Sequence, residues 1–131
     1  MTGSMTRVWP LICCIGFLSV LLGAAGDHLL QGQLTDVTSE RWDVALRYHQ
    51  LYSIILLSLY LFGRSLPKPT RLYNASIIIF LCGMCFFSGS LYLSILLNME
   101  NLTRLTPLGG VLLMAGWLFL TISLPRSRTE S

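Results

Sequence analysis

Four long apolar stretches alternate with short polar stretches along the 131 residues of this chain. The apolar stretches cover residues 8–26, 44–63, 75–97 and 107–124. Roughly 20 helical residues cross a hydrocarbon core about 30 Å thick, and each stretch is close to that length. The pattern therefore predicts an all-α, integral membrane four-helix transmembrane bundle. We expect one transmembrane domain over residues 1–131, with helices near 8–26, 39–63, 72–97 and 107–124.

Charge is sparse and unevenly distributed. Charged residues make up 11% of the chain, whereas soluble domains carry about 25%, so a soluble domain is excluded. One side of the predicted bundle carries six cations and one acid: Arg7, Arg64, Lys68, Arg71, Arg126, Arg128 and Glu130. The other side carries three cations and five acids: Arg41, Arg47, Arg104, Asp27, Asp36, Glu40, Asp43 and Glu100. Positive residues mark the cytoplasmic side, so we expect cytoplasmic N and C termini. Topology accounts for the cations, and no nucleic-acid partner is expected.

Small residues recur at helical spacing inside the apolar stretches. In the first stretch they fall at offsets of 0, 3, 7 and 10 residues, which is one helix face, and in the fourth they repeat every seven. Small side chains let helix backbones approach closely in lipid. The pattern predicts six helix-packing glycines: Gly16, Gly23, Gly26, Gly83, Gly109 and Gly116.

Polar side chains gather toward the outer end of all four predicted helices. The candidate polar cluster in the outer leaflet contains Asp27, His28, Arg47, Tyr48, His49, Ser88, Ser90, Tyr92 and Thr106. Polar residues within a membrane indicate function by default, although a hydrogen-bonded layer that fixes helix register would have the same composition. We place His49 on the inward face of its helix. Our hypothesis is that Asp27 and His49 share one hydrogen-bonded network with Ser90 or Tyr92.

Two local features are expected in the second helix. Thr38 or Ser39 is suited to cap its first turn, because a hydroxyl can accept from a free backbone N–H. Asp43 and Arg47 are spaced i,i+4 in the order that favours an ion pair.

Candidate chemistry is scarce. No nucleophile, base and acid set and no phosphate-binding loop is present, so we predict no catalytic residues, no metal site and no cofactor. His28 and His49, expected at matching depth on neighbouring helices, could ligate a haem iron. Four cysteines lie inside apolar stretches, where thiols usually behave as small hydrophobes, although the CxxC spacing of the last two also suits a metal or redox cluster: Cys13, Cys14, Cys82 and Cys85.

Four sequence blocks carry a resemblance to a known family. Residues 22–28 are similar to a Gly-Ala-x-Gly-Ala-His pattern, and residues 42–49 to a Thr-Ala-x-x-Tyr stretch followed by His. Residues 87–93, Phe-Ser-Gly-Ser-Leu-Tyr-Leu, form the most specific block, and residues 106–110 with Gly116-Trp117 form the fourth. Together these blocks resemble the YgdD-like family, small bacterial inner-membrane proteins grouped as domain of unknown function 423, with eukaryotic relatives.

The resemblance implies a four-helix protein of the cell inner membrane with no established activity. Three positions depart from the family pattern. Asp27 stands where Ala is usual, Val44 where Thr is usual, and Tyr52 where a second His often follows. A mechanism that requires that second His is not expected in this chain.

Three functions are compatible with these features. We expect a non-enzymatic accessory or assembly factor whose partners are the lipid bilayer and either a second copy of itself or another membrane protein. The alternative is a small transporter or channel that uses the outer polar cluster as its site, and this requires an oligomer because four short helices rarely enclose a pore. A haem-bearing electron carrier is the weakest of the three.

Overall fold

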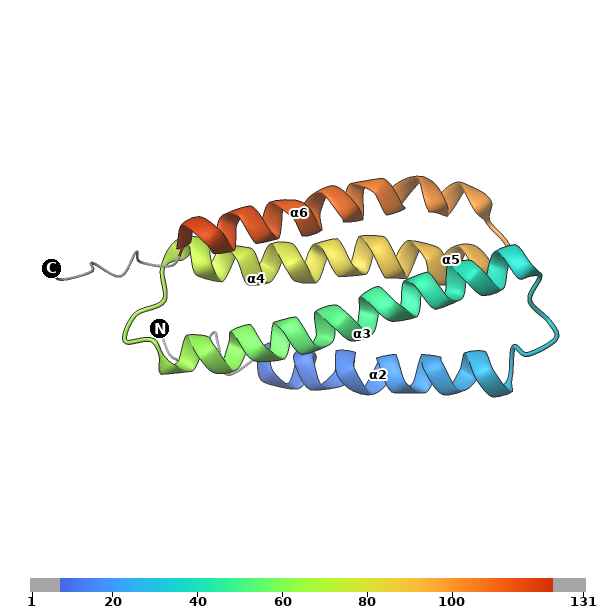
Figure 1. The fold of residues 1–131 in the computed structure, drawn as a ribbon, viewed down its shortest axis with the longest axis horizontal. Helices are drawn as coiled ribbons and strands as arrows, with labels where there is room; N and C mark the ends of the chain where they lie inside the picture. The colour runs from blue at the N-terminus through green and yellow to red at the C-terminus, as the bar shows by residue number, and fades with distance from the viewer. Residues whose placement is uncertain (1–7, 124–131) are drawn as a thin grey trace, which may run out of the picture.

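The computed structural model describes residues 8–123, and nearly all of them are helical (Figure 1). The elements, in chain order, are α2 (Val8–His28), α3 (Asp36–Ser65), α4 (Arg71–Met84), the π-helical turn η1 (Cys85–Gly89), α5 (Ser90–Leu96), the 3₁₀ turn η2 (Glu100–Leu105) and α6 (Thr106–Ser123). The predicted all-α transmembrane bundle is confirmed. The expected last helical residue, Leu124, and the topology residues Arg7, Arg126, Arg128 and Glu130 lie outside the described residues.

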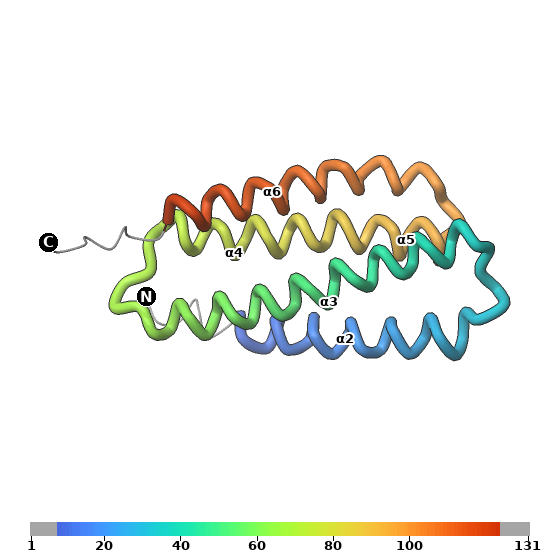
Figure 2. The backbone as a smooth tube through the Cα atoms, in the orientation of Figure 1, coloured from blue at the N-terminus to red at the C-terminus, as the bar shows by residue number. Residues whose placement is uncertain are grey.

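The four helical rods run antiparallel, and their order in space follows the chain (Figures 1 and 2). Helix α2 packs on α3, α3 packs on α4, η1 and α5, and α4 packs closely on α6. Helix α3 and the rod formed by α4, η1 and α5 are therefore the two inner members of the arrangement. Its connection to α4 lies at the end where α2 begins and α6 finishes, and the connection from α2 to α3 lies at the opposite end.

Three helical segments are long and apolar enough to span a membrane: Val8–His28, Arg71–Leu96 and Glu100–Ser123. Helix α3 does not qualify by composition, which corrects the expectation that each apolar stretch would. Its 30 residues extend about 45 Å at 1.5 Å per residue, so length is sufficient. Charged side chains in its first half lower its hydropathy, and helix packing keeps one face of α3 from lipid.

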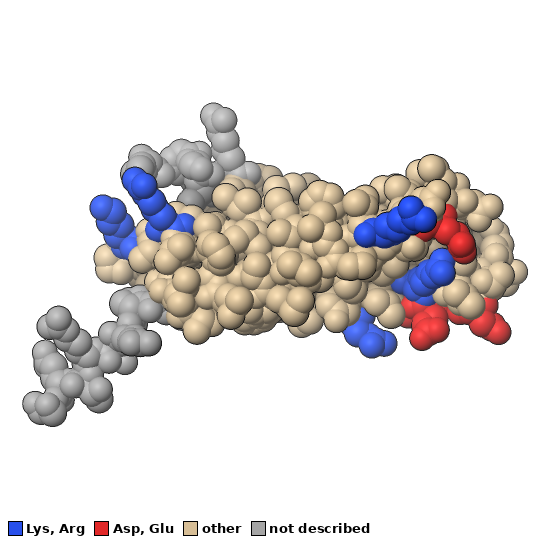
Figure 3. All heavy atoms as spheres, turned by 90° about the horizontal axis from the view of Figure 1, so that it is seen from above, with Lys and Arg blue, Asp and Glu red and all other residues tan. Residues whose placement is uncertain are grey.

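Charge marks the two ends of the bundle. Figure 3 shows basic side chains at one end, basic and acidic side chains at the other, and an uncharged band between them on this face. We call the end with the five acids the acidic end; they are Asp27, Asp36, Glu40, Asp43 and Glu100. Charge is costly in hydrocarbon, so an uncharged band of this kind is what a membrane span requires.

Side-chain caps fix where two helices begin. Thr35 Oγ1 accepts from the Thr38 backbone N–H at 3.3 Å, so α3 begins at Asp36 rather than at the expected residue 39. The expectation that Thr38 or Ser39 would be the cap is wrong, because Thr35 already satisfies that free donor. Thr70 caps α4 in the same way, accepting from the Tyr73 N–H at 3.1 Å.

Glycines set the close packing of α6 on α4 and η1. A Cβ on Gly83 would lie 3.0 Å from the Leu113 backbone nitrogen, and one on Gly116 would lie 2.7 Å from the Phe80 ring. These distances leave no room for a side chain. Small residues permit such backbone approach in lipid, where dispersion contacts replace the hydrophobic effect as the driving force.

Large side chains fill the centre of the bundle beside this interface. Leu56, Tyr73 and Phe80 are each at most 1% exposed. They belong to one core cluster that joins α2, α3, α4 and α6. The interior is therefore occupied along the half of the bundle that lies away from the acidic end.

Candidate functional site

The predicted polar residues lie in separate groups rather than in one layer. His49 is 5% exposed and faces inward from α3, whereas Asp27 and His28 are exposed at the last turn of α2. Arg47 is also exposed, on the opposite side of α3 from His49. The exposed charged groups thus remain at the membrane edge, and only neutral hydrogen-bonding groups enter the interior.

His49 joins three helices. Its Nε2 lies 3.1 Å from the Ile15 carbonyl oxygen of α2. A carbonyl only accepts, so Nε2 carries the proton and donates, and Nδ1 is left as an acceptor. The Tyr92 hydroxyl of α5 donates to Nδ1 over a long 3.5 Å. Both ring nitrogens are thereby engaged, and the imidazole links α2, α3 and α5.

This geometry corrects two expectations about His49. Ile15 lies thirteen residues before His28 on α2, about 20 Å along the helix axis. His28 and His49 therefore do not lie at matching depth. Asp27 sits beside His28, so it is equally far from His49, and the proposed Asp27–His49 network does not form. The expected contact between His49 and Tyr92 is present in the structure.

Other members of the predicted cluster form local contacts. The hydroxyls of Ser90 and Thr106 lie 2.7 Å apart and tie α5 to the start of α6. The Tyr48 ring packs on Phe87 with centroids 4.3 Å apart. Ser88 is buried in η1, and its Oγ has no hydrogen-bond partner. The cluster is thus a set of inter-helix contacts spread over several depths.

The predicted packing glycines of α2 divide into two kinds. A Cβ on Gly23 would lie 3.5 Å from the Leu46 side chain, and one on Gly26 would lie 2.5 Å from Trp42 Nε1. Both glycines therefore face α3. Gly16 has open space around its missing Cβ, so it does not lie at a helix contact in this chain. Gly83, Gly109 and Gly116 all lie in the α4–α6 and η1–α6 contacts described above.

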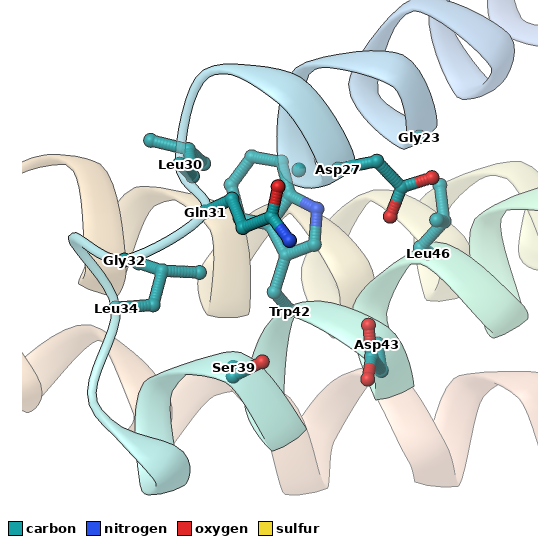
Figure 4. A pocket seen from close by; sticks show the side chains of 11 residues that line it. Gly23, Asp27, Leu30, Gln31, Gly32, Leu34, Ser39, Trp42, Asp43 and Leu46 are labelled. Carbon is teal, nitrogen blue, oxygen red and sulfur yellow. The ribbon is translucent and has the colours of Figure 1, made fainter.

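A pocket of about 420 Å³ opens at the acidic end between α2 and α3. Figure 4 shows its lining, which includes Gly26, Asp27, Gln31, Trp42 and Asp43. Trp42 is 3% exposed, and its Nε1 has no hydrogen-bond partner. The expected Asp43–Arg47 ion pair does not form; the ion pair within residues 8–123 is Arg41–Glu100, at 3.7 Å.

Sequence reasoning missed most of this pocket. It identified Asp27 as polar and Gly23 and Gly26 as packing residues, but it did not join them to Gln31, Trp42 and Asp43. The missing signal was the antiparallel register of α2 and α3, which sets Gly26 against Trp42 and Gly23 against Leu46. Placing the face of α2 that carries the small residues against the face of α3 that carries Trp42 would have predicted the pocket.

The lining of this pocket combines charged and hydrogen-bonding groups with apolar side chains. Its polar groups are carboxylates, an amide, a hydroxyl and an indole N–H, and acceptors and donors of this kind recognise a ligand by charge and hydrogen bonding. Within residues 8–123 there is no group of three or more His, Cys, Asp or Glu side chains placed to hold a metal ion. The four cysteines are exposed on the outer sides of α2, α4 and η1, and they form no disulfide.

The helices and their apolar surfaces define an integral membrane protein. Residues 22–110 match a family model described as "Protein of unknown function (DUF423)". A UPF0382 membrane protein of Staphylococcus haemolyticus is 37% identical over 106 residues, covering 81% of this chain and 84% of the relative. A UPF0382 membrane protein of Schizosaccharomyces pombe is 32% identical over 119 residues, covering 84% of this chain and 94% of the relative.

The chain therefore belongs to the DUF423 family, as the sequence blocks predicted. A Bacillus subtilis member is 30% identical over 106 residues and covers 81% of this chain and 85% of the relative. No solved structure matches the chain. The family carries no assigned enzymatic activity in its description, and the matched range includes every residue that lines the pocket at the acidic end.

Proposed function

We propose that this chain is a non-enzymatic accessory or assembly factor of the inner membrane that packs against another membrane-embedded protein. The observation that carries the proposal is a groove of about 300 Å³ on the side of the bundle, between α3, η1 and α6. Its lining is almost wholly apolar and includes Tyr48, Tyr52, Phe87, Gly110, Met114 and Trp117. Several of these positions belong to the stretch of α6 that is apolar enough to cross a membrane.

Contacts between the aromatic residues hold the walls of this groove in place. Trp117 Nε1 donates to the Tyr52 hydroxyl at 3.2 Å, which spans the groove from α6 to α3. Tyr48 packs on Phe87 across the other wall. Gly110 adds no side chain at the floor, where a Cβ would lie 3.9 Å from the Phe87 ring. Rigid aromatic walls around a small residue suit the insertion of a side chain from a partner helix.

The filled interior favours this function over transport through one chain. Leu56, Tyr73 and Phe80 close the centre of the bundle, so a path for water or solute would have to form between chains. The alternative function, a small oligomeric transporter, is favoured by one observation, the polar pocket at the acidic end. A solute-flux assay in proteoliposomes distinguishes the two, since an accessory factor alone gives no flux above empty vesicles.

A haem-bearing electron carrier receives no support from the histidines. Both ring nitrogens of His49 already have partners, and Ile15, the α2 residue that His49 contacts, lies about 20 Å from His28 along the helix axis. Two axial ligands must approach one iron, and this pair does not.

The proposed orientation has both termini in the cytoplasm. Arg64, Lys68 and Arg71 lie around the connection from α3 to α4, whereas the five acids lie at the opposite end (Figure 3). Cations in short loops mark the cytoplasmic side, which supports this orientation in an inner membrane.

Site-specific photo-crosslinking in native membranes tests the partner. A photoreactive residue at Val111 or Met114, which are 55% and 63% exposed at the groove, should give discrete protein adducts that mass spectrometry can identify. The matched control is Val20 of α2, which is 69% exposed and lies away from the groove. Lipid adducts alone at the groove positions, or the same protein adducts at Val20, would contradict the proposal.

A further inference from the structure

The pocket at the acidic end is electrically one-sided. Asp27 and Asp43 reach it from α2 and α3, and no Lys, Arg or His is among the residues that line it. Neither carboxylate belongs to the Arg41–Glu100 ion pair found within residues 8–123. Two carboxylates that share a concave space without a cation attract a positively charged ligand, because the low-dielectric walls strengthen the field inside.

A buried donor in the same wall supplies the second, independent observation. The Trp42 side chain is almost wholly buried, and its indole N–H has no acceptor. A buried donor without a partner is costly, and such groups are rare in native proteins. The ring edge lies against Gly26, and in Figure 4 its nitrogen is turned toward the side where the Asp27 carboxylate lies. A Cβ at Gly26 would lie 2.5 Å from this nitrogen, so only a glycine leaves the N–H unblocked, and an acceptor that reached it from the Asp27 side would satisfy it.

The volume of the pocket and its apolar walls further limit the kinds of ligand that it can bind. A volume of about 420 Å³ falls in the range of small-molecule sites and is too large for a bare metal ion held by two carboxylates. Leu30, Leu34 and Leu46 supply apolar wall, which suits the carbon atoms of an organic cation. The donor of Trp42 requires an oxygen acceptor near the positive group.

We infer that this pocket binds a small organic ammonium compound that carries an adjacent oxygen. The ammonium group lies between the carboxylates of Asp27 and Asp43, and the oxygen accepts from the Trp42 indole N–H. Ethanolamine chemistry has this arrangement, either as the free amino alcohol or as a lipid headgroup, since the pocket opens at the membrane edge.

Calorimetric titration of the purified full-length protein with ethanolamine tests the site. Ethylene glycol is the matched neutral compound, with the same heavy-atom skeleton and no charge. Ethanolamine should give weak but saturable binding, as expected of a four-atom ligand, and ethylene glycol should give none. The binding should weaken as salt is raised, because the carboxylates are partly open to solvent.

Three variants test the assigned roles. Asp27→Asn and Asp43→Asn should each lower the affinity about tenfold, the loss expected when one charge-assisted contact is removed. Trp42→Phe keeps the ring and removes the N–H, and it should lower the affinity severalfold. Glu40→Gln is the control, because it removes one acid of the same end without touching the pocket lining. It should bind within about twofold of the unaltered protein, since only the general field changes.

Nanodiscs distinguish the two sources of the ammonium group. If the ligand is a lipid headgroup, protein in phosphatidylethanolamine discs should no longer bind added ethanolamine, while protein in phosphatidylglycerol discs should. If the ligand is the free amine, both discs should allow binding; either result retains the site. Absence of saturable binding in detergent and in phosphatidylglycerol discs would overturn the inference. Equal losses for Glu40→Gln and Asp27→Asn, or unchanged affinity for Trp42→Phe, would also overturn it.

Discussion

Replacing Gly109 with alanine tests how closely α6 packs on the π-helical turn η1. A Cβ at Gly109 would collide with the Phe87 backbone nitrogen and would lie 2.7 Å from the Phe87 Cα. These atoms belong to the backbone, so no rotamer change relieves the collision. The variant must separate α6 from η1 and lose dispersion contacts along the crossing. We therefore expect Gly109→Ala to lower the free energy of unfolding.

The neighbouring glycine provides a matched control for the magnitude. A Cβ at Gly110 would lie 3.9 Å from the Phe87 ring, which is ordinary contact. Both substitutions gain about 0.5–1 kcal/mol of helix propensity, so that gain cancels in the comparison. Overpacking a filled interior costs about 1–3 kcal/mol, and this cost falls on Gly109→Ala alone. The two variants should thus differ by about 1–3 kcal/mol in unfolding free energy.

Unfolding by titration with a denaturing detergent, followed by circular dichroism, measures this difference. Gly110→Ala should unfold at the same point as the unaltered protein or later, and Gly109→Ala should unfold earlier. Thermal midpoints in mild detergent should follow the same order. If Gly109→Ala proves as stable as Gly110→Ala, the α6–η1 contact can accommodate a methyl group without loss of stability, and the argument from backbone proximity fails.

Three further predictions follow from individual contacts. In a double-mutant cycle, Tyr92→Phe and His49→Ala should show a coupling of about 0.6 kcal/mol in the free energy of unfolding, which is typical of hydrogen bonds within membranes. Asp27→Ala and His49→Ala should instead be additive within about 0.5 kcal/mol. A larger coupling between Asp27 and His49 would mean that these two residues interact after all. Thr70→Ala should lower the free energy of unfolding by about 0.5–2 kcal/mol, because the cap of α4 is lost, and thermal or detergent unfolding measures this change. Thr70→Ser should restore most of the lost stability. Equal stabilities of the Thr70→Ala variant and the unaltered protein would show that the cap contributes nothing. Reporter fusions after the last residue and in the connection between α2 and α3 should report opposite sides of the membrane, and the same side for both would refute the proposed orientation.

The sequence was sufficient for the fold class because hydropathy and helix length are both local properties. A run of about 20 apolar residues has few alternatives to a membrane span. Helix α3 is the exception: its apolar stretch predicted a helix, but the charged residues of its first half keep the helix out of the three segments that are apolar enough to span a membrane. The positions Trp42, Ala45, His49 and Tyr52, spaced by three and four residues, are all buried, so the inward face of α3 is encoded in the sequence even where its hydropathy is not.

Depth across the bundle was harder to predict. Counting residues from the helix ends placed His49 level with His28. In the structure His49 contacts Ile15, which lies about 20 Å from His28 along the axis of α2. Such counting assumes that all helices begin at one plane and run parallel. Helix α3 begins earlier than expected because Thr35 caps it, and η1 inserts a π-helical turn into the third rod. At the opposite end, α2 begins well inside the level at which α3 ends (Figure 1), so counts from these two helix ends do not start from one plane.

The two proposed surfaces share α3, and this makes α3 the helix through which they can influence each other. Trp42 lies in the wall of the pocket at the acidic end, and its ring packs on Tyr92 with centroids 4.9 Å apart. Tyr92 contacts His49, and one turn further along the same helix Tyr52 accepts from Trp117 at the groove. Ligand binding that shifts Trp42 would therefore press on Tyr92 and, through it, on His49 of α3, the helix that also carries Tyr52, and packed interiors transmit such strain because they compress little. Loss of groove cross-linking on addition of ethanolamine would demonstrate this coupling, whereas unchanged cross-linking would show that the pocket and the groove act independently.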